Sequence, residues 1–345
     1  MKKFLLLPLM LIATLLGAES AMSCSRILYV GNDSLRIVGR SLDWKTPIPT
    51  NIYVYPRGIT KKSHNIPGAF EWTSRYGAIY AVGYDGGITE GMNEKGLVIN
   101  GLFCKGTVYD NAETSSLPPM SLSVFIGWLL DLNATTPEVV KVLRQHDFNI
   151  SGETFDGGTA STLHWGVTDA QGRCAIFEFD HGNINIYEGI DMRAMTNDPP
   201  YPQITAINNY WDKIGGAHML PGTVSSPDRF VRGDFFDRHV AKTGDADLGV
   251  SIIRSILMNL SVPYTYLIEG EPNVSSTQWR SFANLRDLRY YFDIVTHPGL
   301  FYIDLSKCDL RPGAPIMKID NEKSAGYIGD ATDRLEKSKP FTPMY

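Results

Sequence analysis

Residues 21–26 read Ala21-Met22-Ser23-Cys24-Ser25-Arg26 and place a cysteine directly after small residues typical of a signal-peptidase site. Cleavage before Cys24 makes this cysteine the first residue of the mature chain, so that a thiol and a free α-amine share one residue. The thiolate is a nucleophile, and an α-amine with a pKa of about 7.7–8.0 can hold and release a proton near neutral pH. The stretch therefore predicts a cysteine nucleophile that carries its own base, the sulfur analogue of an N-terminal threonine.

Residues 1–23 have the three parts of a secretory signal. Lys2-Lys3 form the charged start, Phe4 to Gly17 form the apolar run, and small residues precede Cys24. The run is too short to span a bilayer, and no later segment approaches the ~20 apolar residues that a span needs. We expect an exported protein, periplasmic or secreted, without a membrane span. The alternative is a bacterial lipid anchor on Cys24, although residues 21–23 lack the leucine usual before such a cysteine.

The composition fits an ordinary globular protein with a sizeable core. The chain has 345 residues, of which 43% are hydrophobic and 20% are charged. Its net charge is −5 and it has no long run of Lys and Arg, which argues against a nucleic-acid partner. Without a repeat or a clear linker, we expect one domain over residues 24–345, in which residues 310–345, rich in Lys, Asp, Pro and Gly, form a trailing arm.

The pattern along the chain predicts many short strands and a few helices. Apolar runs between Gly, Pro and Asn clusters predict strands at 27–30, 35–40, 51–55, 70–73, 78–82, 96–103, 163–168, 174–179, 183–187, 192–196, 288–295 and 300–305. Helices are expected at 120–132, 139–145 (capped by Thr136), 204–214, 227–240 (capped by Ser226) and 248–260. The strands from 163 to 196 are expected in one sheet. Strands and helices segregate rather than alternate, which favours a layered α+β fold.

Signals for cofactors and metals are missing from the sequence. The glycine-rich nucleotide motifs, the H-E-x-x-H motif and G-x-S-x-G do not occur, and the seven histidines form no i, i+4 pair. We therefore predict no cofactor and no metal. Cys104, Cys174 and Cys308 are isolated and are expected to be small buried hydrophobic residues, although one disulfide among them stays open in an oxidising compartment.

Two charged residues follow Cys24 in the segment Gly39-Arg40-Ser41-Leu42-Asp43-Trp44. If a hairpin folds Cys24 against this segment, Asp43 can hold the α-ammonium group and Arg40 can favour the thiolate. Residues i and i+3 of a regular strand point to opposite faces, so this meeting requires a bulge or a strand that ends near Leu42. Taken alone, the pair reads as a surface arginine and a turn-capping aspartate.

Three later segments complete a pattern: Gly91-Met92-Asn93-Glu94-Lys95-Gly96-Leu97, Met195-Thr196-Asn197-Asp198-Pro199-Pro200 and Ser226-Pro227-Asp228-Arg229-Phe230. With Cys-Ser-Arg and G-R-S-L-D-W ahead of them, in this order, the chain resembles the choloylglycine hydrolase family, which contains conjugated bile salt hydrolases and penicillin V acylases. The resemblance runs from Cys24 to about Leu305.

This resemblance implies an N-terminal nucleophile hydrolase, a four-layer αββα sandwich with two antiparallel sheets. It implies that Cys24 is the nucleophile, that Arg40 and Asp43 are the family's Arg-x-x-Asp pair, and that Asn197 donates to the oxyanion. It also implies that Arg229 is an active-site arginine. The chemistry is amide cleavage through a thioester, with protons passing through the α-amine of Cys24.

Substrate recognition is less defined by these motifs. Phe103 stands where better-known members carry Asn or Tyr, so any hydrogen bond given there comes from its backbone. Trp44, Phe103 and Trp72 are candidates to line the acyl pocket. The connection between Asn197 and Arg229 lacks the long insertion of several family members, and in this the chain resembles the exported, Gram-negative-type branch of the family. Because tetramers are common in the family, the resemblance also suggests a homotetramer.

We therefore expect an amidohydrolase that acts on a small-molecule amide with a bulky apolar acyl group. Conjugated bile salts are favoured, with penicillin V as the alternative, followed by acyl-homoserine lactones and, more weakly, ceramide-like amides. Two other possibilities stay open. An internal histidine such as His164 could be the base instead of the α-amine, or the chain could be a lipid-anchored binding protein in which Asn197 and Arg229 are scaffolding.

Overall fold

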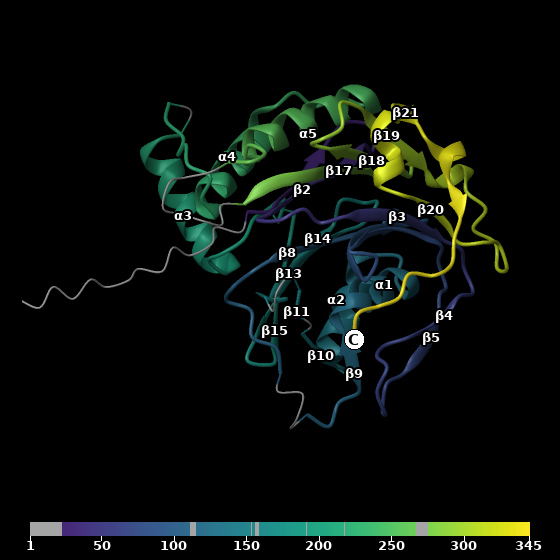
Figure 1. Ribbon diagram of the computed structural model, residues 1–345. Coiled ribbons are helices and arrows are strands. Elements are labelled where there is room, and N and C mark those ends of the chain that lie inside the picture. Colours follow the sequence, from purple (N-terminus) through teal and green to yellow (C-terminus); the bar gives the residue numbers. More distant parts are fainter. Residues whose placement is uncertain are drawn as a thin grey trace, which may run out of the picture.

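The computed structural model describes residues 23–110, 115–152, 154–155, 159–190, 192–216, 218–266 and 275–345. The expected signal sequence, apart from Ser23, lies outside the described residues. Two large sheets face each other, and helices cover the outer face of each (Figure 1). The order helix, sheet, sheet, helix is the expected αββα arrangement of an α+β fold.

The first sheet has seven strands and contains the segment that begins at Cys24. Its order is β16 (Ala194–Met195), β1 (Ser25–Val30), β2 (Arg36–Trp44), β17 (Ser276–Asn284), β18 (Arg289–Ile294), β19 (Leu300–Asp304) and β21 (Gly329–Asp330). Neighbouring strands are antiparallel except β19 and β21, which are parallel.

The second sheet has nine antiparallel strands. Its order is β15 (Asn183–Glu188), β14 (Cys174–Asp180), β13 (Leu163–Thr168), β8 (Val98–Phe103), β7 (Gly87–Asn93), β6 (Ala78–Gly83), β3 (Thr50–Tyr55), β20 (Met317–Ile319) and β22 (Glu336–Lys337). Three two-stranded pieces lie outside both sheets: β4 (Thr60–Lys62) with β5 (Glu71–Thr73), β9 (Pro119–Ser121) with β10 (Asn149–Ser151), and β11 (Thr154–Phe155) with β12 (Thr159–Ala160).

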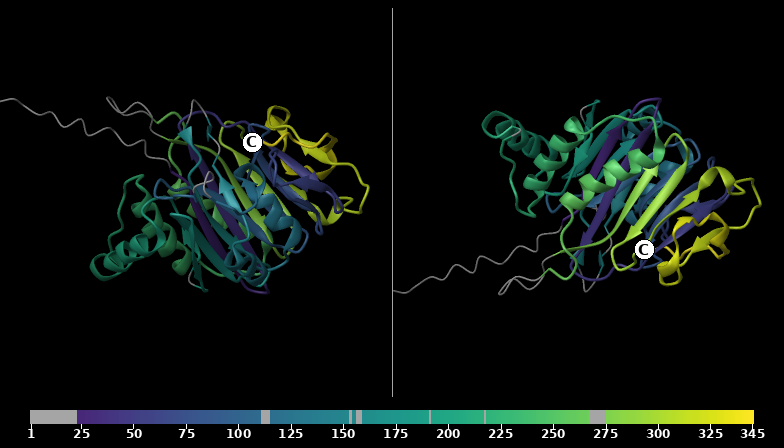
Figure 2. Two further views of the ribbon diagram at one scale, coloured as in Figure 1. Left: turned by 90° about the horizontal axis from the view of Figure 1, so that it is seen from below. Right: turned by 90° about the horizontal axis from the view of Figure 1, so that it is seen from above.

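Five α-helices form the outer layers of the described part. Helices α1 (Leu122–Leu132) and α2 (Thr136–Gln145) cover the nine-stranded sheet, whereas α4 (Ser226–His239) and α5 (Ala246–Leu260) cover the seven-stranded sheet, with α3 (Tyr201–Ile214) packed against α4. The two views of Figure 2 show α3 and α4 at one side of the sandwich. Short 3₁₀ turns occur at Leu305–Lys307, Glu322–Gly326 and Thr332–Arg334. Within the described residues, every helix is too short or too polar to cross a bilayer.

Each layer boundary is a hydrophobic core. The core between the sheets contains Leu28 and Val38 from one sheet and Ile79 and Val98 from the other. A second core lies under α1 and α2, and a third under α4 and α5. Gly39 belongs to this third boundary, since a Cβ atom there would lie 2.8 Å from Cγ1 of Ile253 on α5. The glycine of G-R-S-L-D-W thus lets the helix approach the strand beside the site.

The structure differs from the sequence-based expectations in several places. β7 and β17 were not expected: β7 contains two glycines, and β17 is rich in polar residues, although both are almost wholly buried between other layers. β16 pairs with β1 and so belongs to the seven-stranded sheet, not to the sheet of β13–β15. The caps of α2 and α4 are Thr135 and Ser225, one residue earlier than expected.

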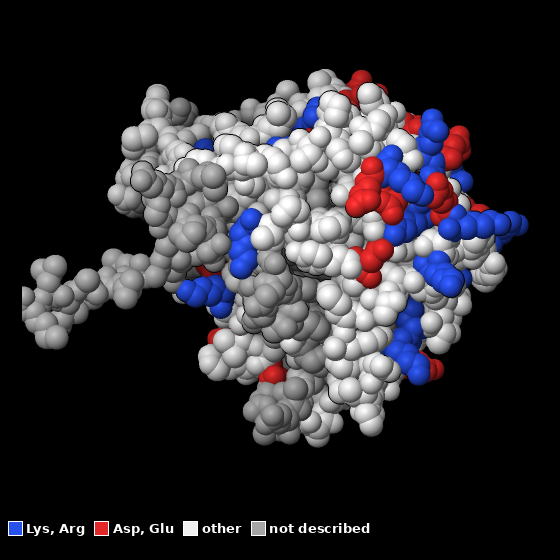
Figure 3. Space-filling model, viewed as in Figure 1, with Lys and Arg blue, Asp and Glu red and all other residues white. Residues whose placement is uncertain are grey.

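Residues 310–345 do not behave as a trailing arm. They add β20 and β22 to one sheet and β21 to the other. Phe341 is buried in the core under α1. The backbone N–H of Met344 donates to the carbonyl oxygen of Gly86 (3.0 Å), and its carbonyl accepts from Ser123 Oγ (2.6 Å). Basic and acidic side chains gather together on the side of the molecule where the yellow C-terminal segments lie (Figure 3, seen as in Figure 1). One ion pair within residues 310–345 joins Lys323 and Glu336.

Candidate active site

The hairpin β1–β2 places Cys24 beside the G-R-S-L-D-W segment. Ser25 pairs with Ser41 and Arg26 with Arg40, so Cys24 lies at the level of Leu42. On the other edge of β1, Arg26 pairs with Met195 of β16, which leads directly into Asn197. Two segments that are about 170 residues apart in the sequence therefore meet at the cysteine, whose backbone N lies 2.6 Å from Oδ1 of Asn197.

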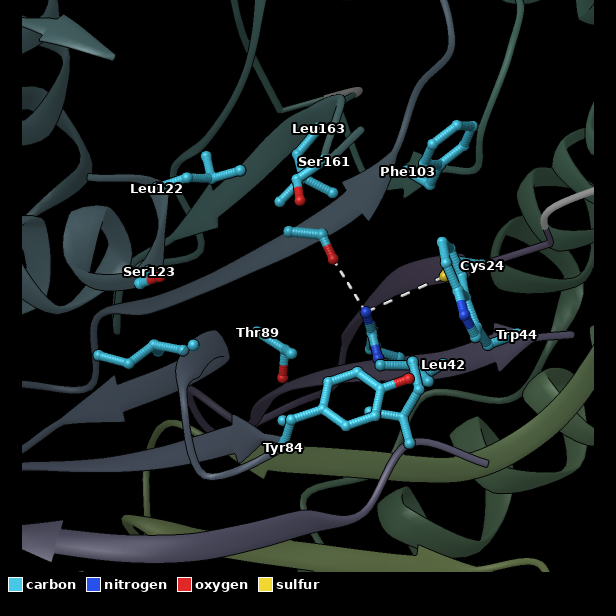
Figure 4. Close-up of a pocket in the computed structure, with 16 residues that line it drawn as sticks. Cys24, Leu42, Trp44, Tyr84, Thr89, Phe103, Leu122, Ser123, Ser161 and Leu163 are labelled. Carbon is cyan, nitrogen blue, oxygen red and sulfur yellow. Dashed lines mark hydrogen bonds between the residues drawn. The ribbon is translucent and has the colours of Figure 1, made fainter. Parts of the chain in front are cut away.

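A buried arginine lies next to the thiol. Nη2 of Arg40 is 4.0 Å from Sγ of Cys24 and donates to the carbonyl oxygen of Gly101 at 2.9 Å (Figure 4). Its guanidinium group lies 4.7 Å from the ring centre of Trp279. Arg40 is thus buried beside the sulfur and is not a surface residue.

Asn197 is the centre of the hydrogen bonds around Cys24. Its Oδ1 accepts from the backbone N of Cys24 and from Nη2 of Arg229 (2.8 Å). Its Nδ2 donates to the carbonyl oxygen of Phe103 at 2.7 Å. An amide NH₂ group has two N–H bonds, so one is left for a further acceptor such as the oxygen of a substrate.

Arg229 is fully buried on the first turn of α4. Its Nη1 donates to the carbonyl oxygen of Cys24 (2.5 Å) and to Oγ of Ser25 (2.7 Å), and its Nε donates to the carbonyl oxygen of Val224 (2.9 Å). Burial lowers the pKa of Arg229, while the charges of Asp43 and Cys24 act in the opposite direction. Arg229 therefore fixes the backbone of the nucleophile and the side chain of Asn197 together.

Asp43 is fully buried, and its carboxylate is only partly hydrogen bonded. Its Oδ2 accepts from Ser41 Oγ at 3.5 Å, and its Oδ1 has no hydrogen-bond partner. Burial raises the pKa of Asp43 to about 6, although the nearby charge of Arg229 lowers it. In the chain described here Ser23 still precedes Cys24, so the atom that would become the α-ammonium group is a peptide nitrogen.

A bulge lies next to Asp43, in the strand that pairs with β2. The register of β17 against β2 shifts where Thr277 pairs with Asp43 and Trp279 pairs with Leu42, which leaves Gln278 as the extra residue. The sequence required a bulge or a strand end near Leu42. The bulge is present, but it lies in the facing strand, and β2 continues to Trp44.

An apolar cavity opens onto Cys24 and Arg40 (Figure 4). Its wall is formed mainly by apolar and aromatic side chains: Leu42, Trp44, Ile48, Tyr84, Ile88, Phe103, Leu122 and Leu163. The rings of Trp44 and Phe103 are in edge contact, with centroids 6.0 Å apart. Two of the three predicted lining residues, Trp44 and Phe103, are therefore placed in the cavity wall. The third candidate, Trp72, was wrong: it lies in the core under α1, where its Nε1 donates to Asp131 (2.6 Å).

Glu90 on β7 is a neighbour of the site that the sequence did not reveal. It is fully buried, and its Oε2 lies 3.3 Å from Nε of Arg40. Asn100 Nδ2, Ser281 Oγ and Tyr290 Oη also donate to its carboxylate. The guanidinium group of Arg40 is a buried charge and needs a partner of opposite sign. The carboxylate of Glu90 is that partner. Glu90 lies in a stretch with two glycines and no periodic pattern, so the sequence did not indicate that its side chain would be buried beside Arg40.

The ring of His164 is engaged by groups other than Cys24. Its Nδ1 is 3.0 Å from Oε1 of Glu178, and its Nε2 is 2.7 Å from the carbonyl oxygen of Thr196, so both ring nitrogens are engaged. Among the described residues, Cys104, His164 and Glu178 are the one group whose ligand-type atoms lie within 4.8 Å of one another. Because both nitrogens of the ring are hydrogen bonded, we describe this group as a hydrogen-bonded cluster. Cys24, Cys104, Cys174 and Cys308 are all free thiols.

The family of this chain follows from comparisons with known proteins. Residues 24–325 match the family model of linear amide C–N hydrolases, the choloylglycine hydrolase family. A penicillin V acylase from Pectobacterium atrosepticum is 34% identical, over 96% of this chain and 95% of the relative. A bile salt hydrolase/transferase from Bifidobacterium longum is 22% identical, over 80% and 93%.

Solved structures similar to this chain also include a penicillin V acylase and a bile acid hydrolase. The penicillin V acylase from Agrobacterium tumefaciens is 35% identical and superposes with a TM-score of 0.86, over 93% of this chain and 99% of that one. A conjugated bile acid hydrolase from Clostridium perfringens, 20% identical with the same coverage, shares the fold with a TM-score of 0.72. The chain belongs to the choloylglycine hydrolase family of linear amide C–N hydrolases.

Proposed function

We propose that this protein hydrolyses amides whose acyl part is apolar and aromatic, with penicillin V as the representative substrate. The observation that carries the proposal is the cavity of aromatic and aliphatic side chains that ends at Sγ of Cys24 and at Arg40. The identity to two penicillin V acylases, 34% and 35%, supports this substrate over bile salt conjugates, for which the relative is 22% identical.

The proposed mechanism begins after removal of residues 1–23. The free α-amine of Cys24 takes the proton of the thiol, and the thiolate attacks the amide carbonyl carbon. The second N–H of Asn197 Nδ2 receives the developing oxyanion. The α-ammonium group then gives its proton to the leaving nitrogen as the C–N bond breaks, which leaves a thioester on Cys24 and releases the amine.

The second half of the reaction returns the enzyme to its starting state. The α-amine takes a proton from water, the resulting hydroxide attacks the thioester, and the acid leaves as the thiolate is reformed and reprotonated. Asp43, whose Oδ1 is unpaired and buried, gains the α-ammonium group as a cationic partner in the processed chain. We propose accordingly that the protein is exported and that its mature form begins at Cys24.

The test is a comparison of substrates on the protein as exported by a bacterial host. Intact mass first shows whether the chain starts at an unmodified Cys24. Amine release is then measured with penicillin V, glycocholate, taurocholate and an acyl-homoserine lactone, with Cys24→Ala as the control. We expect the highest kcat/KM with penicillin V. A higher kcat/KM with a bile salt would overturn the substrate proposal.

The same samples separate the enzyme from the alternative of a binding protein. A free N-terminal Cys24 and hydrolysis of at least one amide support the enzyme. A diacylglyceryl adduct on Cys24, which removes the thiol, contradicts it and supports a lipid-anchored protein.

A further inference from the structure

The turn that carries Asn197 is held from the nine-stranded sheet. Nε2 of His164, on β13, is 2.7 Å from the carbonyl oxygen of Thr196, the residue directly before Asn197. The N–H of the same peptide group, that of Asn197, donates to Ser226 Oγ at 2.9 Å. One peptide plane is therefore fixed at its oxygen by one sheet and at its nitrogen by α4.

The other end of the turn is held by Glu178 on β14. The backbone N of Tyr201, the first residue of α3, donates to both carboxylate oxygens at 3.0 and 3.2 Å. Pro200, the N-cap of this helix, makes no side-chain cap bond, so Glu178 supplies the missing acceptor. Because Nδ1 of His164 is 3.0 Å from Oε1 of Glu178, the two holding points form one unit.

The partners of His164 determine its charge. A backbone carbonyl can only accept a hydrogen bond, and Oε1 of Glu178, which already accepts the backbone N–H of Tyr201, is an acceptor toward the ring as well. Both ring nitrogens of His164 must then carry hydrogen, which makes the ring an imidazolium. Burial acts to lower the pKa of His164, but hydrogen bonds to Cys104 and Glu178 act in the opposite direction, and the result is a pKa raised to about 10.

The surroundings of the pair contain three other titratable groups. The Cys104 thiol, at the end of β8, lies with His164 and Glu178 in one buried cluster and is 3.7 Å from Oδ1 of Asp198. Burial raises the pKa of Tyr187, on β15, and the charge of Glu178 and a hydrogen bond to it act in the same direction. The described groups around the ring are therefore acidic in type, and none of them is a competing cation.

We propose that His164 is a permanent imidazolium at neutral pH and that, with Glu178, it is a positioning residue for Asn197. The catalytic part of this inference rests on the proposed function. The amide of Asn197 is one residue from the held peptide group, and misplacement of a catalytic group by about 1 Å costs on the order of 100-fold in rate. Loss of either holding point should therefore affect the reaction step more than substrate binding.

The charge is tested on the unaltered enzyme by ¹⁵N NMR of its histidine rings, assigned with His164→Gln. We expect both ring nitrogens of His164 to be protonated from pH 6 to 8. A neutral tautomer in this range would overturn the inference. The measurement needs no variant to be active and no substrate.

The positioning role is tested with His164→Gln and Glu178→Gln, with His181→Gln as the matched control. His181 is exposed, and its ring pairs with the exposed carboxylate of Asp180 instead of with the cluster. With the substrate that the wild type cleaves, we expect kcat of the two test variants to fall by about 10- to 100-fold and KM to change by less than about threefold. We also expect faster amide hydrogen exchange at residues 196–201. An unchanged kcat together with unchanged exchange would overturn the positioning role.

The two proposals fail in different ways. If the wild type cleaves no amide, the proposed function fails, while the NMR signal and the exchange at residues 196–201 still decide whether His164 and Glu178 hold the turn. If a test variant does not fold, the other variant and the wild-type NMR signal decide the question.

Discussion

The carbonyl oxygen of Phe103 accepts a hydrogen bond from Nδ2 of Asn197 at 2.7 Å. The residue whose ring lines the acyl cavity thus also orients, through its backbone, the amide that we assign to the oxyanion. The side chain and the backbone of Phe103 can therefore be tested separately, because a substitution changes the ring and keeps the carbonyl.

Phe103→Ala should weaken substrate binding more than catalysis. Loss of an aromatic contact of this size is worth about 1–2 kcal/mol, so we expect KM for an aromatic acyl amide to rise roughly 5- to 30-fold while kcat changes by less than about threefold. Steady-state kinetics give both values. Trp72→Phe, outside the cavity, is the control and should leave KM unchanged. A large fall in kcat with constant KM would contradict the assignment of the ring to binding.

Asn197→Ala should lower kcat by about 100- to 1,000-fold, as for loss of one oxyanion donor. KM should change much less. Because Oδ1 of Asn197 also accepts from the N of Cys24, the thiol reactivity of the variant should be measured with an alkylating reagent alongside the kinetics. A kcat within about threefold of the wild-type value would show that the oxyanion is stabilised elsewhere.

Cys24→Ala should abolish turnover and leave the fold intact, and Cys24→Ser should be almost as inactive because a hydroxyl is a poorer nucleophile with a far higher pKa than a thiol. The control is Cys308→Ala, since Cys308 is half-buried directly after the 3₁₀ turn Leu305–Lys307 and is not among the residues that line the cavity. Product release and circular dichroism report on activity and folding. Full activity of Cys24→Ala would refute the proposed nucleophile.

A chain that keeps Met-Ala in front of Cys24 should not hydrolyse amides. Its α-amine has become a peptide N–H, which cannot take up a proton. The thiol should still react with a small labelling reagent, and proteolytic trimming to Cys24 should restore turnover. Normal turnover of the extended form would place the base on another residue.

Asp43→Asn should stabilise the unprocessed chain, and more so at pH 7 than at pH 4. The folded-state pKa of Asp43 is raised to about 6, so between its unfolded value near 3.8 and about 6 the folded state binds more protons than the unfolded state. Stability therefore falls as pH rises through this window. The pKa difference corresponds to an upper limit of about 3 kcal/mol at pH 7.

Urea unfolding of the Cys24→Ala chain, with and without residues 1–23, checks this prediction. In the processed chain the α-ammonium group pairs with the carboxylate, so the gain from Asp43→Asn should be smaller or reversed. An equal gain in both forms would argue against contact between the amine and Asp43.

The sequence predicted the layers of the fold and named Arg40, Asp43, Asn197 and Arg229, the four residues that the structure places around Cys24, because ordered motifs carry that information over the whole chain. It did not predict β17, since Thr277, Gln278 and Ser281 are polar residues that are buried with partners elsewhere in the chain, such as Trp44 for Gln278 and Glu90 for Ser281. It did not predict Glu90 or the pair His164 and Glu178 either. Their roles depend on contacts between strands that are distant in sequence, and neither local periodicity nor spacing records such contacts.

The position of β17 has a consequence for how the protein folds. β17 pairs with β2 in the middle of the seven-stranded sheet, and Nε2 of Gln278, at the bulge, donates to the carbonyl oxygen of Trp44, 234 residues earlier in the chain. Such non-local pairing is entropically costly and slow to form. Until residue 284 has been synthesised, the strand that carries Arg40 and Asp43 has an open edge. During most of its synthesis the chain therefore lacks the strand that holds Arg40 and Asp43 beside the thiol. The active site can form only when almost all of the protein has been made.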